Sequence, residues 1–141
     1  MKMNKKEIYE MAETMEIITR LISENKILSL TKIIFLTFSI KNMKIFFSPT
    51  NKKFGLINEV YQSISYGFQS NFKDFTFIFK SLDILKEGNY IEIQENKVNI
   101  LRKFHCSREN TIMNSQFFKK IIGEIMKLSD LSFIKGVIDN V

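Results

Sequence analysis

The feature that most constrains this fold is a helical pattern that runs directly into two short alternating segments. Apolar residues recur at helical spacing over about 72–87, and they are Phe75, Ile78, Phe79, Leu82 and Leu85. The pattern stops at Gly88. Residues 90–94 and 97–101 then alternate between apolar and polar side chains, around a two-residue turn at Glu95-Asn96. The sequence therefore predicts a helix followed by a β-hairpin, with one apolar hairpin face formed by Ile91, Ile93, Val98 and Ile100.

Helical periodicity dominates the rest of the chain. Further helices are predicted at about 5–24, 30–41, 56–69, 115–128 and 130–140. Most start beside a side chain that can cap the first turn, and the candidate caps are Asn4, Ser29, Ser115 (or Asn114) and Ser129, with Asn71 and Asp74 for the helix at 72–87. The helix at 30–41 is apolar on nearly every side, which predicts a central position in the core.

The chain length of 141 residues indicates one domain. We divide it into a helical hairpin at 5–41, a helix–wing unit at 56–101 and C-terminal helices at 115–140, and leave residues 42–55 unassigned. A helix that runs into a two-stranded ribbon is typical of the back half of a winged helix. The predicted fold class is therefore mostly α with a small β-hairpin, as a winged-helix-like single domain.

Winged helices bind either DNA or proteins, and the charge pattern bears on that choice. The formal net charge is +6, which invites a nucleic-acid interpretation, and the candidate contacts near the hairpin are Lys97, Arg102, Lys103 and Arg108. However, 18 of the 21 basic residues are lysines, and arginine is the usual reader of guanine. The polar hairpin face is slightly acidic, and the helix at 56–69 carries no cation. DNA binding is therefore the alternative and protein binding the preferred function.

Residues that could form an active site are scarce. The chain has one histidine and one cysteine, His105 and Cys106, which are too few for a zinc site and lack a third catalytic group. The five glycines are scattered, so no phosphate-binding loop exists. We predict a non-enzyme without cofactor or metal. The sequence shows no signal peptide and no apolar run of membrane-spanning length, which favours a cytoplasmic protein.

The chain has 14 phenylalanines, several of them adjacent or nearly so. Neighbouring residues in a helix point about 100° apart, so a small domain has difficulty burying both members of such pairs. Exposed aromatic side chains commonly mark partner surfaces. The predicted protein-interface residues are Phe46, Phe47, Phe77, Phe117 and Phe133.

The order of these parts resembles the middle component of bacterial ABC-three-component systems, which are predicted defence systems against phage and other mobile DNA. The resemblance lies in an N-terminal helix ending in Arg20-Leu21-Ile22, the apolar segment 28–36, the helix and hairpin at 82–101, and the segment 124–137. It implies a non-catalytic linker between an ABC-type ATPase and an effector-like third component. The family supplies no catalytic residues, so the expected function is an adaptor that acts through protein–protein contacts.

Overall fold

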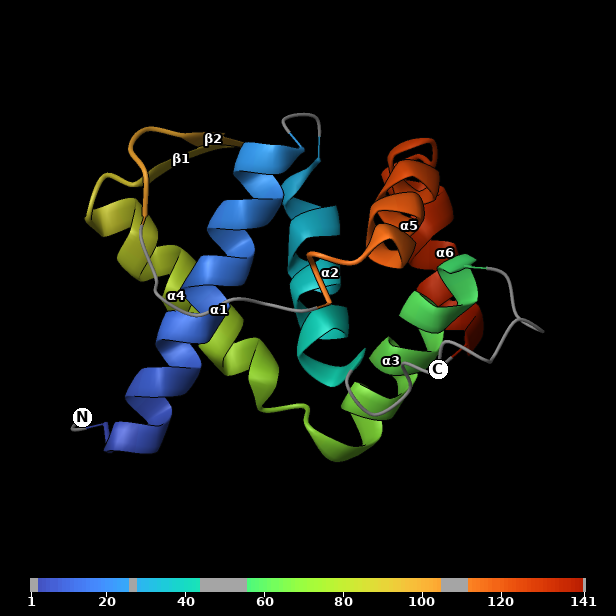
Figure 1. Cartoon of the computed structure of the whole chain (residues 1–141), viewed down its shortest axis with the longest axis horizontal. Helices are drawn as coiled ribbons and strands as arrows, with labels where there is room; N and C mark the ends of the chain where they lie inside the picture. Colours follow the sequence, from blue (N-terminus) through green and yellow to red (C-terminus); the bar gives the residue numbers. More distant parts are fainter. Residues whose placement is uncertain (1–2, 26–27, 44–55, 105–111, 141) are drawn as a thin grey trace.

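A computed structural model gives the fold and describes residues 3–25, 28–43, 56–104 and 112–140. In these ranges the elements are α1 (Lys5–Glu24), α2 (Leu30–Met43), α3 (Leu56–Ser70), α4 (Asp74–Glu87), β1 (Ile91–Gln94), β2 (Lys97–Ile100), α5 (Gln116–Met126) and α6 (Asp130–Asn140). Figure 1 shows α2 in the middle, with α1 and α4 on one side of it and α3, α5 and α6 on the other. The prediction of a mostly helical chain with a small hairpin is confirmed.

Local capping sets several helix starts as predicted. Asn4 Oδ1 accepts a hydrogen bond from the backbone N–H of Glu7 at 2.9 Å, and α1 has the predicted bounds. Ser115 Oγ and Ser129 Oγ cap α5 and α6 in the same way, and α6 also has the predicted bounds. These side chains satisfy N–H groups that have no partner within the helix.

The start of α4 differs from the prediction. This helix begins at Asp74, and no side chain caps its first turn. The predicted cap by Asn71 is wrong, because its side-chain amide donates to Asn42 Oδ1 on α2 at 2.8 Å instead. A long-range contact therefore involves the side chain that the local pattern assigned to capping.

The central helix α2 contacts α1, α3, α4 and α6, as its apolar character predicts. The Phe38 ring of α2 packs directly against Gly67 of α3, where an added Cβ would overlap the ring. One turn away, the buried hydroxyls of Ser39 and Ser63 form a hydrogen bond at 2.5 Å. A single core cluster joins residues from all the elements named above. No helix in the described ranges is long and apolar enough to cross a membrane.

The hairpin has the predicted register and faces. The strands pair antiparallel, with Ile91 opposite Ile100 and Ile93 opposite Val98. Ile91 and Val98 are buried, while Gln94 and Asn99 on the other face are exposed. Glu95 adopts φ 57° to close the turn, a conformation that is unusual for a residue other than glycine. Alternation of side chains was therefore sufficient to set the strand pairing.

The hairpin turn is tied to the start of α2. The backbone carbonyl of Asn96 accepts a hydrogen bond from Leu30 N–H at 2.9 Å. The side-chain Oδ1 of Asn96 accepts from Thr31 N–H at 3.1 Å. Its Nδ2 donates to Asp130 Oδ2 on α6, while Ser29 Oγ donates to Asp130 Oδ1 at 2.7 Å. Ser29 Oγ also accepts from the backbone N–H of Lys32 at 3.2 Å. The first turn of α2 is therefore capped largely by a residue from a distant part of the chain.

We expect Asn96→Ala to lower the free energy of unfolding by roughly 0.5–2 kcal/mol, the usual cost of losing a helix cap. Urea denaturation of the whole chain measures this change. Asn99→Ala is the matched control, because Asn99 is an exposed asparagine on the same hairpin, and we expect it to change stability by less than about 0.5 kcal/mol. Equal denaturation midpoints for the two variants would contradict the capping role of Asn96.

Candidate functional site

A row of phenylalanines leads from the core to the surface beside α4. Phe75 and Phe79 lie four residues apart on one side of α4, and Phe72 lies in the turn just before the helix. The Phe75 ring stacks on Phe38 of α2, with centroids 4.0 Å apart, and also contacts Phe68 at 5.5 Å. Phe72 packs on Phe75 at 5.4 Å and Phe79 on Phe75 at 6.4 Å. We call Phe68, Phe72, Phe75 and Phe79 the aromatic face.

The outer two rings of the aromatic face meet solvent. Phe72 is 60% exposed and Phe79 51% exposed, whereas Phe75 and Phe68 are half-buried. Single exposed apolar residues are ordinary, but these two are joined through a continuous set of ring contacts. The inner rings contact the outer ones and pack against the core, so this apolar surface is continuous with the core. Such a surface is suited to binding another protein.

The sequence pattern of α4 did not reveal which phenylalanine would be exposed. The buried stripe of the helix is Ile78, Leu82 and Leu85. Phe77 and Phe79 each lie about 100° from the centre of this stripe, on opposite sides of the helix. Phe77 is half-buried, and Lys41 Nζ of α2 lies 5.8 Å from its ring centroid. Phe79, which the pattern assigned to the core, is the more exposed of the two.

The other predicted interface residues have different surroundings. Phe133 is fully buried, so the prediction that it forms an accessible interface is wrong. It belongs to the inward side of α6, where it lies between Phe35 and Tyr61, with centroids 6.3 and 6.0 Å away. Phe117 is half-buried against the core. Phe46 and Phe47 lie outside the described residues.

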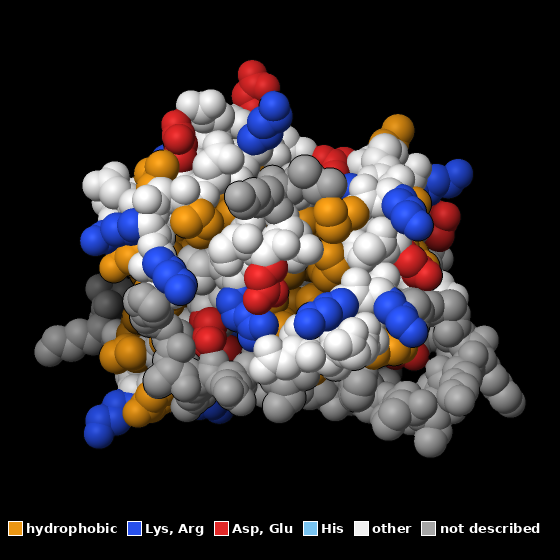
Figure 2. All heavy atoms as spheres, turned by 45° about the horizontal axis from the view of Figure 1, so that its top comes forward, with side chains coloured by type: hydrophobic (Ala, Val, Ile, Leu, Met, Phe, Trp, Pro, Cys, Tyr) orange, Lys and Arg blue, Asp and Glu red, His pale blue; other side chains and the backbone are white. Residues whose placement is uncertain are grey.

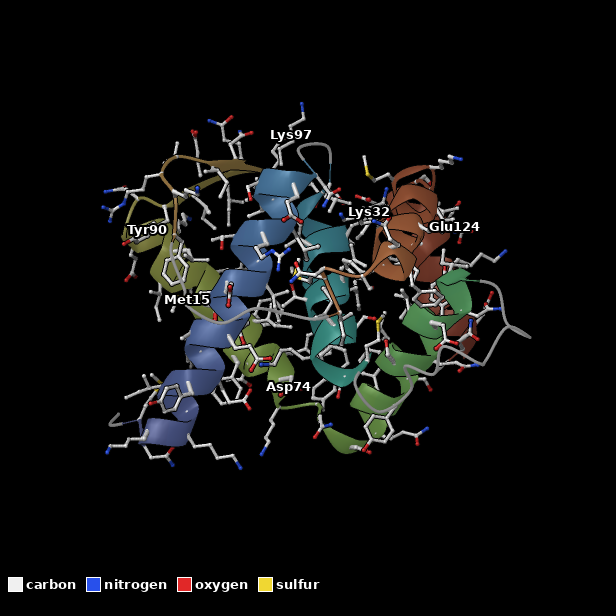
Figure 3. The ribbon with its side chains drawn as sticks, in the orientation of Figure 1. Met15, Lys32, Asp74, Tyr90, Lys97 and Glu124 are labelled. Atoms are coloured by element: carbon white, nitrogen blue, oxygen red, sulfur yellow. The ribbon has the colours of Figure 1, made fainter. Side chains whose placement is uncertain are left out.

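The residues proposed for nucleic-acid contact do not gather at one place. Lys97 begins β2, while Arg102 and Lys103 follow its far end, more than about 13 Å along the strand. All three are exposed, and Figure 3 shows Lys97 pointing outward at the top of the molecule. The Arg102 guanidinium lies 3.9 Å from the Tyr90 ring centroid and donates to Gly88 O at 2.7 Å. Arg108 lies outside the described residues.

The charge on the face that contains the hairpin is mixed. Figure 2 shows lysine and arginine side chains interspersed with acidic ones and with apolar side chains between them. The hairpin turn itself is engaged by α2 through Asn96. A wing that reaches into a DNA groove needs a free, basic tip. The described part of this hairpin has neither property.

A second candidate site is a charged cleft of about 430 Å³ between the start of α1, the end of α2 and the start of α4. At its base, the Lys41 ammonium lies 2.9 Å from Glu10 Oε2 and donates to Thr14 Oγ1 at 2.8 Å. Asn42 Nδ2 lies 3.4 Å from Asp74 Oδ2 on the other wall. Lys41 is almost wholly buried, so this network holds three helices together around one ammonium group.

Burial raises the pKa of the Asp74 carboxyl above its ordinary value, and repulsion by Glu10 adds to this effect. Attraction by Lys41 and the hydrogen bond from Asn42 lower the pKa of Asp74, without cancelling the rise. In the described ranges, no three His, Cys, Asp or Glu side chains are grouped to hold a metal ion. The Lys41–Glu10 ion pair and the Asn42–Asp74 hydrogen bond join α1, α2 and α4 at this cleft.

Comparisons with protein-family models, with curated proteins and with solved structures gave no significant match to this chain.

Sequence reasoning missed the exposed pair Phe72 and Phe79. The signal was present, because Phe75 and Phe79 form a second apolar side of α4, next to the buried stripe, and Phe72 extends it into the preceding turn. A helix with two apolar sides needs either two neighbours or a partner. What the pattern lacked was the position of α1, which covers the Phe77 side of the helix.

We expect Asp74→Asn to be more stable than the wild type at pH 7. Because the Asp74 pKa is raised on folding, its ionised form costs stability above its pKa, and this cost disappears as the pH falls below the ordinary value of 3.8. Thermal unfolding of both proteins between pH 3 and pH 7 should therefore show a stability difference that shrinks toward acid pH.

The control is Asp83→Asn, which removes the same charge from an exposed position on α4 and should change stability by less than about 0.5 kcal/mol. If Asp74→Asn is less stable than the wild type at pH 7, attraction to Lys41 outweighs burial, and the pKa of Asp74 is lowered on folding instead of raised.

Proposed function

We propose that this protein is a non-catalytic adaptor subunit of a bacterial multiprotein complex and binds a protein partner through the aromatic face. The observation that carries the proposal is the pair of exposed rings, Phe72 and Phe79, held in place by Phe75. Covering the exposed half of each ring would contribute about 1 kcal/mol to binding. Aromatic anchors of this kind are common energetic centres of protein interfaces.

The contacts of the hairpin support a protein partner over DNA. In the winged-helix interpretation, α3 and α4 with the hairpin form the helix–wing unit. The tip of that wing is hydrogen-bonded to Leu30 and Thr31 and to Asp130, which favours a structural role for the hairpin. An exposed surface suited to a partner lies beside α4, where the described residues form the aromatic face.

The resemblance to the middle component of ABC-three-component systems suggests which partners to seek. On that basis we propose a cytoplasmic defence complex in which this subunit lies between an ABC-type ATPase and an effector-like third component. The aromatic face would bind one of these two proteins. This assignment depends on the order of helices and hairpin in the sequence, and a partner of another kind on the same face would leave the adaptor role intact.

We expect the double variant Phe72→Ala/Phe79→Ala to lose its partner while remaining folded. The measurement is co-purification of the tagged protein expressed from its own operon, with circular dichroism to check the fold. Ile84→Ala is the control, because Ile84 is 43% exposed on the opposite side of the same helix. It should retain the partner at the wild-type ratio.

Two results would contradict this function. Stoichiometric recovery of the partner by the folded double variant would exclude the aromatic face. Recovery of the wild-type protein without any other operon product would remove the support for an adaptor.

The alternative function, a DNA-binding regulator, depends on Lys97, Arg102 and Lys103. It predicts duplex binding whose logarithm falls steeply with the logarithm of salt concentration, because phosphate contacts release counterions. A titration from about 50 to 200 mM salt measures the slope. We expect little binding at either concentration, since the hairpin carries Glu92 and Glu95 beside Lys97. A steep slope that is lost in Lys97→Ala/Lys103→Ala would favour the alternative.

A further inference from the structure

Asn42 is a buried polar residue near the end of α2, and only 1% of its surface is exposed. Both ends of its side-chain amide form hydrogen bonds. Nδ2 donates to the backbone carbonyl of Phe38 on the same helix at 2.9 Å, and to Asp74 Oδ2 at the longer distance of 3.4 Å. Oδ1 accepts from Nδ2 of Asn71 at 2.8 Å. The buried amide therefore joins α2 to the segment between α3 and α4.

Asn71 and Asp74 are the first and last residues of a tight turn. The N–H of Asp74 donates to the carbonyl of Asn71 at 2.9 Å, which closes the turn around Phe72. The turn is also joined to the end of α3, because the N–H of Asn71 donates to Gly67 O at 2.8 Å. Asn42 therefore binds both ends of the turn that carries Phe72.

The two exposed rings of the aromatic face come from different kinds of backbone. Phe79 extends from the regular part of α4, whereas Phe72 lies before the helix begins. Phe72 is 60% exposed, and its ring contacts Phe68 and Phe75 with centroids 5.7 and 5.4 Å away. The position of Phe72 relative to Phe79 therefore depends on the conformation of the turn.

We infer that Asn42 is a positioning residue of the aromatic face, which fixes the turn so that Phe72 and Phe79 bind the partner together. This inference rests on the proposed function, and it makes binding depend on a buried residue that the partner does not touch. An apolar side chain at position 42 would avoid the cost of burying an amide, but it would place no directional restraint on the turn. A surface that is already ordered loses less conformational entropy on binding, so the restraint strengthens the complex.

The test compares three variants of the full chain. Asn42→Leu removes the buried amide, and Asn71→Ala removes the other partner of the 2.8 Å hydrogen bond from a half-buried position. Ser39→Ala is the matched control, because Ser39 is also a buried polar residue of α2, and its hydroxyl bonds to Ser63 in the middle of α3. Circular dichroism and urea denaturation establish that each variant is folded.

The first readout is the mobility of the side chain at position 72. The chain contains no tryptophan, so Phe72→Trp introduces a single fluorescent reporter. Time-resolved anisotropy separates local motion of the indole from tumbling of the whole protein. We expect Asn42→Leu or Asn71→Ala to raise the amplitude of local motion at least about twofold, and Ser39→Ala to leave it unchanged. A residue that only contributed to stability would not change this amplitude in the folded protein.

The second readout is co-purification of the tagged chain from its own operon, with Phe72 intact. We expect Asn42→Leu and Asn71→Ala to recover at most about a tenth of the partner that the wild type recovers, because the turn must be ordered during binding. Ser39→Ala should recover the partner in the wild-type amount.

Several outcomes would overturn the inference. They are unchanged reporter mobility in the folded Asn42→Leu and Asn71→Ala variants, an equal rise in Ser39→Ala, or raised mobility with full recovery of the partner. If Asn42→Leu does not fold, Asn71→Ala decides the result. The reporter needs no partner, so a wild-type chain that recovers none would contradict the proposed function, while the mobility still shows whether Asn42 fixes the turn.

Discussion

The structure depends on how the first turn of α2 finds partners for its backbone N–H groups. This helix lies at the centre of the core, so an uncapped start would leave polar groups short of hydrogen bonds. Ser29 supplies one acceptor locally, and Asn96 supplies two from the hairpin turn. Asp130 then joins both residues to the start of α6. One small polar cluster therefore fixes the hairpin, the central helix and the last helix relative to one another.

This arrangement changes how the hairpin contributes to function. In a DNA-binding wing, the tip projects and carries cations to phosphate. Here the tip stabilises the fold, and the stacked Arg102 and Tyr90 hold its other end. The surface that we propose for a partner is helical and apolar, and it lies beside α4. The fold thus joins the hairpin turn to α2 and α6, and we propose that recognition uses the side of α4.

Local sequence signals predicted much of this fold. Asn4 and Ser129 set helix starts through contacts within one turn, and alternation set the register of Ile93 opposite Val98. The candidate site was harder to predict, because Phe77 and Phe79 occupy equivalent positions at the two edges of a buried stripe. The position of α1 and the Lys41 ammonium decide between them. On α6 it was equally hard to predict that Phe133 is buried and Leu131 exposed. The hydrogen bonds of Asn96 join residues that are far apart in the sequence, so no local pattern predicts them.

The polar cluster at α2 also has a consequence for how the chain is made. Its members come from residues 29–32, from residue 96 and from residue 130, close to the C-terminus. During synthesis, the N-terminal helices emerge first, and α2 acquires its remaining caps only when the hairpin has been translated. Asp130 joins the cluster later still, with the start of α6. The finished arrangement is therefore reached late, through contacts of high sequence separation, although most of the secondary structure is local.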